Sequence, residues 1–171
     1  MAALVWDTSG ILHAARAERL DVLGDLAKGH RHVMTAAVLE ELDRYGLAVA
    51  VAECGWMETV HVDGLADLAC LVRWTALVSD GQHDRGEATV CAWAEAHGGT
   101  AILDDAAAKA TAVRAGLEVH GSLWVIADGV RSGHLSEPAA DGLVDALARD
   151  GARFPFPSRG FSHWARAQDL F

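Results

Sequence analysis

The residues of this sequence that could do chemistry are carboxylates placed at the ends of predicted strands. Asp7 follows the short apolar run at residues 3–6, and the pair Asp104-Asp105 follows the apolar run at residues 100–103. If such carboxylates converge, they can hold Mg²⁺ or Mn²⁺, which prefer hard oxygen ligands. These ions activate water and stabilise the charge that develops when a phosphodiester is cleaved. The chemistry predicted is therefore metal-dependent phosphodiester hydrolysis.

Further carboxylates lie on two predicted helices. Glu40 and Glu41 belong to a helix expected at residues 36–45, and Asp84 and Glu87 begin a helix expected at residues 84–97. Asp84 and Glu87 are three residues apart and therefore share a helix face. Successive residues at a strand end point to opposite sides, so we expect only one of Asp104 and Asp105 to be a principal ligand.

Each acid also has a purely structural interpretation. Asp7, Asp84 and one of the pair Asp104-Asp105 could be helix N-caps, and the spacing of Asp84 and Glu87 is that of a capping box. Glu40 and Glu41 could be solvated helix residues. For any single residue the structural interpretation is favoured, and only the ordered set points to catalysis.

The elements that must position these acids alternate along the chain. Strands are predicted at residues 3–6, 32–35, 57–62, 100–103 and 117–120, and helices at residues 8–19, 21–28, 36–45, 65–78, 84–97, 106–115, 122–132 and 138–149. Such alternation predicts a three-layer α/β/α fold, a mainly parallel central sheet covered by helices on both faces. In such sheets ligands bind at the carboxyl ends of the strands, where Asp7 and the Asp104-Asp105 pair are expected.

We expect one nuclease domain over residues 1–150 and a C-terminal extension over residues 151–171. The 171 residues contain no linker-like or repetitive stretch. The extension is rich in aromatic side chains, which we expect to pack on the domain, a second copy of the chain or a small protein inhibitor. These aromatic residues are Phe154, Phe156, Phe161, Trp164 and Phe171.

Composition excludes several classes of protein. A net charge of −10 argues against a non-catalytic nucleic-acid binder, which normally has a basic face. The three cysteines and nine histidines show no zinc-like spacing. No apolar run is long enough to cross a bilayer, and the N-terminal apolar run is too short for a signal peptide, so we expect a cytoplasmic protein without a membrane association.

The ordered motifs resemble the PIN-domain family, including the toxin halves of bacterial toxin–antitoxin pairs. The matching pieces are WDTSGIL, VLEEL, DRGEATVCAWA and AILDDAAAKA, followed by GLEVHGSLWVIADGVRSG. The resemblance covers about residues 3–150, with the motifs in the family's order and spacing. No single motif is specific, whereas the ordered set is.

The resemblance implies metal-binding and catalytic roles for four acids, Asp7, Glu41, Glu87 and Asp105. Glu41 is preferred to Glu40 because the family's acid usually precedes an aliphatic residue. Asp105 is preferred to Asp104 because a polar residue usually precedes the family's ligand. Glu87 stands where related toxins often have Asp.

Auxiliary roles are expected for four more residues. Asp84 and Asp104 are candidates for supporting the ligands, and Thr8 and Ser9 match hydroxyl residues that orient metal-bound water or cap a helix. For RNA binding, the candidates near the predicted site are Arg85 and Lys109. Three of the six tryptophans, Trp6, Trp93 and Trp124, are expected in the core.

The leading functional hypothesis is a Mg²⁺- or Mn²⁺-dependent endoribonuclease, a toxin silenced by a cognate antitoxin and forming a homodimer. The alternative is a catalytically silent scaffold of the same fold. Acids occupy all four ligand positions, which argues against the loss of catalytic activity that this alternative requires. A phosphotransferase of the haloacid-dehalogenase type ranks lower, because it needs a second Asp two residues after the first and position 9 is Ser.

Overall fold

The computed structural model describes residues 3–26, 28–78 and 85–171 and has a central sheet of five parallel strands. The strand order is β3-β2-β1-β4-β5. The strands are β1 (Ala3–Trp6), β2 (Arg31–Thr35), β3 (Met57–Val60), β4 (Thr100–Ile102) and β5 (Val119–His120). The predicted α/β class and parallel sheet are confirmed.

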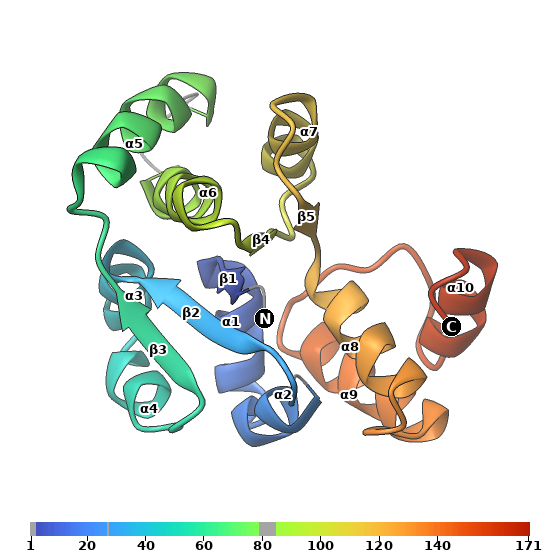
Figure 1. The fold of residues 1–171 in the computed structure, drawn as a ribbon. Helices are drawn as coiled ribbons and strands as arrows, with labels where there is room; N and C mark the ends of the chain where they lie inside the picture. The colour runs from blue at the N-terminus through green and yellow to red at the C-terminus, as the bar shows by residue number, and fades with distance from the viewer. Residues whose placement is uncertain (1–2, 27, 79–84) are drawn as a thin grey trace.

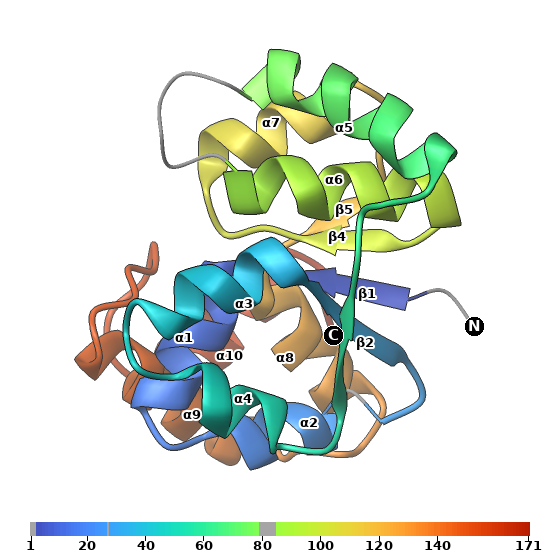
Figure 2. The ribbon, with the colours of Figure 1, turned by 90° about the vertical axis from the view of Figure 1, so that its left-hand side faces the viewer.

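Helices cover both faces of this sheet (Figure 1). Figure 2 shows α5, α6 and α7 on one side of the strands, and α1, α4, α8 and α9 on the other. The helices are α1 (Thr8–Arg16), α2 (Leu20–Leu26), α3 (Ala36–Asp43), α4 (Ala48–Ala52), α5 (Leu65–Val78), α6 (Arg85–His97), α7 (Ala106–Arg114), α8 (Ser122–Arg131), α9 (Glu137–Arg149) and α10 (Phe161–Ala167).

The core forms around β1, which is central in the sheet. All four of its residues are buried, as expected of a parallel strand covered on both faces. Helix α6 packs on β1, β2 and β4, and its buried residues run from Gly86 to Ala94 with Glu87 only partly exposed. Small residues such as Ala88 and Ala92 let this helix lie between the sheet and α5.

Most predicted elements are present with ends shifted by a few residues. Two short helices, α4 and α10, were not predicted, because five or seven residues show too little periodicity to identify a helix. The predicted loop at residues 79–83 and the candidate Asp84 lie outside the described residues. Trp6 and Trp93 are buried in the core as predicted, and Trp124 is partly buried and packs against it.

The sheet order creates a switch point between β1 and β4. The chain moves outward from β1 to β2 and β3, and then returns to the other side of β1 to form β4 and β5. The connections diverge at the carboxyl ends of β1 and β4, which is where open α/β sheets bind ligands. Asp7 and Asp104 follow these two strands.

The C-terminal segment folds back onto α9. Phe161 at the start of α10 is buried, and the side chain of Ser162 and its backbone amide both donate to Asp141 of α9, at 3.0 and 2.8 Å. Aromatic contacts of Phe161 with Phe156, Trp164 and Phe171 complete this packing. Within the described residues, no helix combines the length and the apolarity needed to span a membrane.

Candidate active site

Asp7 lies at the switch point, directly after β1. Its backbone amide donates to the carbonyl oxygen of Ile102 in β4 at 3.0 Å, which fixes the end of β1 against β4. The Asp7 side chain caps α1, accepting bonds from the amide and the hydroxyl of Ser9, at 3.4 and 3.1 Å. The capping interpretation of Asp7 is therefore correct, but it leaves the burial of the carboxylate unexplained.

The electrostatics of Asp7 set it apart from an ordinary cap. The residue is only 7% exposed, and burial raises the pKa of its carboxyl to about 6. Hydrogen bonds from Thr8 and Ser9 oppose this rise, and the negative charge of Glu41 adds to it. Among its described neighbours no cation contributes to this pKa. A buried carboxylate without a compensating charge is costly, so the site favours binding a cation.

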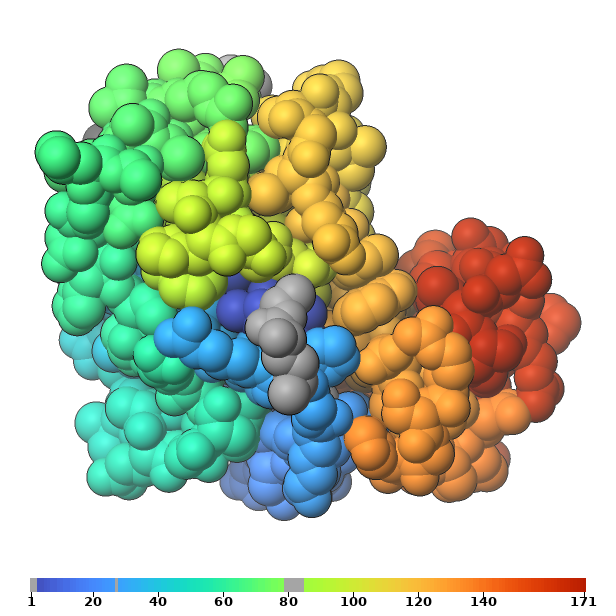
Figure 3. All heavy atoms as spheres, viewed as in Figure 1, coloured from blue at the N-terminus to red at the C-terminus, as the bar shows by residue number. Residues whose placement is uncertain are grey.

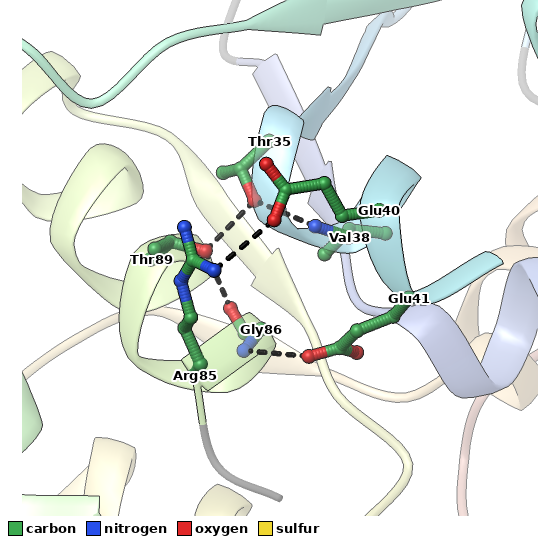
Figure 4. A network of polar contacts seen from close by, with 7 residues as sticks. All are labelled: Thr35, Val38, Glu40, Glu41, Arg85, Gly86 and Thr89. Carbon is green, nitrogen blue, oxygen red and sulfur yellow. Dashed lines mark hydrogen bonds and ion pairs between the residues drawn. The ribbon is translucent and has the colours of Figure 1, made fainter. Parts of the chain in front are cut away.

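Glu41 on α3 is held beside Asp7 by two donors. One carboxylate oxygen accepts the backbone amide of Gly86 at 3.0 Å, and the other accepts the hydroxyl of Thr8 in a short hydrogen bond. Its neighbour Glu40 is exposed and pairs with Arg85 at 3.0 Å (Figure 4). The structure thus brings Glu41 to the site and directs Glu40 away from it.

A hydroxyl network fixes α3 relative to the start of α6, and hence Glu41 relative to Gly86 (Figure 4). Thr89 donates to the carbonyl oxygen of Gly86 at 2.8 Å, and its hydroxyl lies 2.7 Å from that of Thr35. Because Thr89 has one proton to donate, Thr35 must donate to Thr89. Thr35 in turn accepts the amide of Val38 and caps α3.

Glu87 completes a pocket of about 260 Å³ over Asp7 and Glu41. Cys91, one turn further along α6, is fully buried, and burial together with the charges of Glu87 and Asp7 raises the pKa of its thiol to about 12. A thiol with that pKa stays protonated at neutral pH in the metal-free chain and is therefore not a nucleophile there. The pocket is lined by Asp7, Thr8, Ser9, Leu12, Glu41, Arg44, Tyr45 and Glu87.

Asp104 and Asp105 have different surroundings although both are exposed. One Asp105 oxygen accepts the amides of Ala107 and Ala108, both at 2.8 Å, so this residue is the N-cap of α7. Asp104 accepts the amide and the hydroxyl of Ser122 at the start of α8, at 2.8 and 3.0 Å. A Cβ atom built on Gly10 would lie 3.5 Å from the other Asp104 oxygen. Asp104 therefore lies between the starts of α1 and α8, next to the pocket that holds Asp7.

The two candidate RNA-binding residues are placed differently. Arg85 is exposed and paired with Glu40 at the rim of the site. Lys109 is half-buried beside Gly121, in a second pocket that adjoins the first through Ser9. Sequence reasoning missed the amide of Gly86 and the hydroxyl of Ser122 as partners of the acids. The signals that were available are the glycine before Glu87 and the Gly-Ser pair at residues 121–122.

The donor set of this site suits a hard divalent cation. Asp7, Glu41 and Glu87 line one pocket, and Asp7 is buried without a counter-charge. Over residues 3–26, 28–78 and 85–171, no three His, Cys, Asp or Glu side chains are arranged to hold a metal ion as they stand. The chemical type of the donors and the uncompensated burial of Asp7 nevertheless fit Mg²⁺ or Mn²⁺.

Comparison with known families gives one match. The model of a family described as a PIN domain matches residues 3–157, from β1 to the segment that precedes α10. No curated protein and no solved structure shows significant similarity to the chain. The matched region contains all the acids of the site, whereas α10 lies beyond it.

Proposed function

The chain belongs to the PIN-domain family, and from this membership and the acidic pocket we propose that it is a Mg²⁺- or Mn²⁺-dependent endoribonuclease. PIN domains are generally nucleases and typically use divalent metals. The choice of RNA and of these two metals is our proposal.

The observation that carries the proposal is the state of Asp7. A buried carboxyl with its pKa raised to about 6 lies next to the carboxylate of Glu41, whose negative charge adds to that rise, and no cation is among the groups that lower it. A divalent cation bound there would compensate both. Its other ligands in the proposal are Glu87, which lines the same pocket, and Asp104 at the end of β4.

We assign the fourth carboxylate to Asp104 instead of the sequence-based choice, Asp105. Asp105 is the N-cap of α7 and lines neither the pocket of Asp7 nor the pocket that adjoins it, whereas Asp104 lines the second of these. Asp104 adjoins Ser9, which lines the pocket of Asp7.

A bound cation would supply a water molecule acidic enough to attack phosphorus and would stabilise the charge on the phosphate oxygens. The residues of the chain hold the carboxylates in place. Ser9 donates to Asp7, Thr8 and the amide of Gly86 donate to Glu41, and Ser122 donates to Asp104. Each of these bonds fixes one acid before metal and substrate bind.

The proposal extends to a toxin that acts in the cytoplasm and is silenced by a protein antitoxin, with the chain as a homodimer. Its support is the apolar surface of α5, where Leu65 is 90% and Val72 is 75% exposed and Leu68 and Leu77 are also exposed. Leu65, Leu68 and Val72 are three and four residues apart and share a helix face, and exposed apolar faces are typical of protein contacts. We further propose that residues 1–150 form the nuclease unit and residues 151–171 an added segment.

The test is cleavage of a mixed pool of single-stranded RNA by the purified chain with Mg²⁺, with Mn²⁺ and with EDTA. We expect fragments only with a divalent metal and none from Asp7→Asn protein. If the wild-type chain binds RNA but leaves it intact under all three conditions, the scaffold alternative replaces the enzyme. Equal cleavage by wild-type and Asp7→Asn protein would indicate a contaminating nuclease.

A further inference from the structure

A second and larger pocket adjoins the candidate active site. Its volume is about 490 Å³, within the roughly 300–1,000 Å³ typical of small-molecule sites. Ser9 lines both pockets, and Asp104 lies in the wall of the second. The remaining walls come from α7, β5, α8 and the C-terminal segment, and Figure 3 shows a notch in the surface between α7 and α10.

The walls of this pocket contain flat aromatic surface. The rings of His120 and Trp124 are stacked, with centroids 4.0 Å apart and planes 8° from parallel, and both are half-buried. Trp164 of α10 and Phe154 lie in the wall formed by the C-terminal segment. Such rings bind the faces of nucleic-acid bases by stacking, whatever the base.

The charge of the pocket is opposite to that of the whole chain. Lys109 and Arg153 line it, and Asp104 is its only acidic side chain, although the net charge of the chain is −10. Neither cation forms an ion pair with another described residue. A Cβ at Gly121 would lie 2.8 Å from the Lys109 ammonium, so the glycine makes room for this cation beside Asp104. Anions are therefore attracted to the pocket, next to the carboxylates.

His120 adds a polar edge to the aromatic wall. Burial lowers the pKa of its imidazole, and Lys109 contributes to this while Glu118 opposes it. Its Nε2 faces a carboxylate oxygen of Glu118 at 3.7 Å, and its other nitrogen can meet the edge of a base.

We propose that this pocket binds one base of the RNA strand, beside the phosphate held at the acidic site. In this arrangement the base stacks on the aromatic wall of Trp124 and Trp164, and Lys109 and Arg153 contact the adjoining phosphates. The proposal rests on the proposed ribonuclease function. Trp164, one of the two stacking rings, lies beyond the family match at residues 3–157, so the family's common part does not encode this side of the pocket.

The test measures binding of a fluorescent single-stranded pentanucleotide in EDTA, where metal-dependent cleavage cannot occur. Matched oligonucleotides lack the base at one position each, and the proteins are wild type, Trp164→Leu, Trp124→Leu and Arg153→Ala. Arg114→Ala is the control, since Arg114 is an exposed cation on α7 outside the pocket. Circular dichroism and thermal unfolding check that each variant is folded.

We expect removal of the base at one position to weaken wild-type binding about tenfold, the order of one lost stacking contact. Trp164→Leu or Trp124→Leu should weaken binding of the intact oligonucleotide similarly and leave binding of that abasic oligonucleotide unchanged. Arg153→Ala should weaken both equally and reduce the dependence on salt, and Arg114→Ala should match wild type.

Two results would overturn the pocket assignment, and a third would separate it from the ribonuclease proposal. Equal losses for intact and abasic RNA in the tryptophan variants would do so even if the wild-type chain cleaves RNA. Unchanged RNA affinity with altered self-association in light scattering would make the pocket a protein contact instead. If the tryptophan variants show the expected base-dependent losses but the wild-type chain cleaves no RNA with Mg²⁺ or Mn²⁺, the pocket still binds a base. The proposed ribonuclease activity is then refuted.

Discussion

The backbone amide of Gly86 donates to the carboxylate of Glu41 at 3.0 Å, so closely that a side chain at position 86 has no room. A Cβ atom there would lie 2.7 and 2.8 Å from the two carboxylate oxygens. Glycine at this position therefore allows an acid of α3 to reach the start of α6. The contact links two segments that are 45 residues apart in the sequence.

The first prediction follows from this contact. Gly86→Ala should displace the flexible end of Glu41 while keeping the fold, because alanine favours a helix over glycine by about 1 kcal/mol. RNA cleavage should fall about 100-fold, as expected when a catalytic group shifts by about 1 Å. The matched control is Gly142→Ala on α9, where an added Cβ meets nothing within 4 Å. Single-turnover cleavage and thermal unfolding are measured for both variants. If Gly86→Ala protein cleaves RNA as fast as Gly142→Ala protein, catalysis does not depend on the observed position of the Glu41 carboxylate.

The second prediction distinguishes the two adjacent acids after β4. Asp104→Asn should lower single-turnover cleavage at saturating Mn²⁺ strongly, by several kcal/mol of transition-state stabilisation, the order expected for a lost metal ligand. Asp105→Asn should retain most activity, since Asn is also a good N-cap, and Asp105→Ala should cost about 1 kcal/mol of stability. A larger activity loss at Asp105 than at Asp104 would restore the assignment made from sequence.

The third prediction concerns Asp7 and pH. Its folded pKa of about 6 exceeds the value of 3.8 for an ordinary aspartate, so the unfolded chain loses this proton at lower pH than the folded chain. In EDTA the contribution of Asp7 to the free energy of unfolding should therefore fall by about 3 kcal/mol as pH rises from about 3 to about 7, with most of the fall between about pH 4 and about pH 6. Asp7→Asn protein should lack this fall. Urea unfolding of both proteins across this range gives the difference, and parallel curves would contradict the raised pKa.

The fourth prediction is that Mn²⁺ stabilises the folded chain. Binding at 100 times the dissociation constant adds about 2.7 kcal/mol, which for a domain of this size raises the unfolding midpoint by about 5–10 °C. The shift should be larger at pH 7.5 than at pH 5, because the metal binds the ionised form of Asp7. Asp7→Asn protein is the control and should shift less. No shift in the wild type, with no heat of binding in calorimetry, would leave the acids as caps and surface residues.

The fold class and the position of Asp7 follow from local patterns in the sequence. Apolar runs alternating with helical patterns are local signals, and they predicted β1, β2 and β4 within about a residue of their ends. Asp7 directly follows a strand whose residues are all buried, so any parallel sheet places it at the carboxyl edge. The sequence could not locate α10, because this short helix is held by Asp141 and by neighbouring aromatic rings rather than by its own periodicity.

The choice between neighbouring acids depends on contacts that form in the folded chain. Whether Asp104 or Asp105 adjoins the site depends on the direction in which α7 leaves β4, and extended backbone at Asp105 turns its side chain onto the α7 amides. Asp104 then meets Ser122, a residue 18 positions later. The separation of Glu40 from Glu41 depends in the same way on distant partners, Arg85 and Gly86. Adjacent carboxylates have nearly the same local preferences, so contacts between remote segments decide which of them enters the pocket.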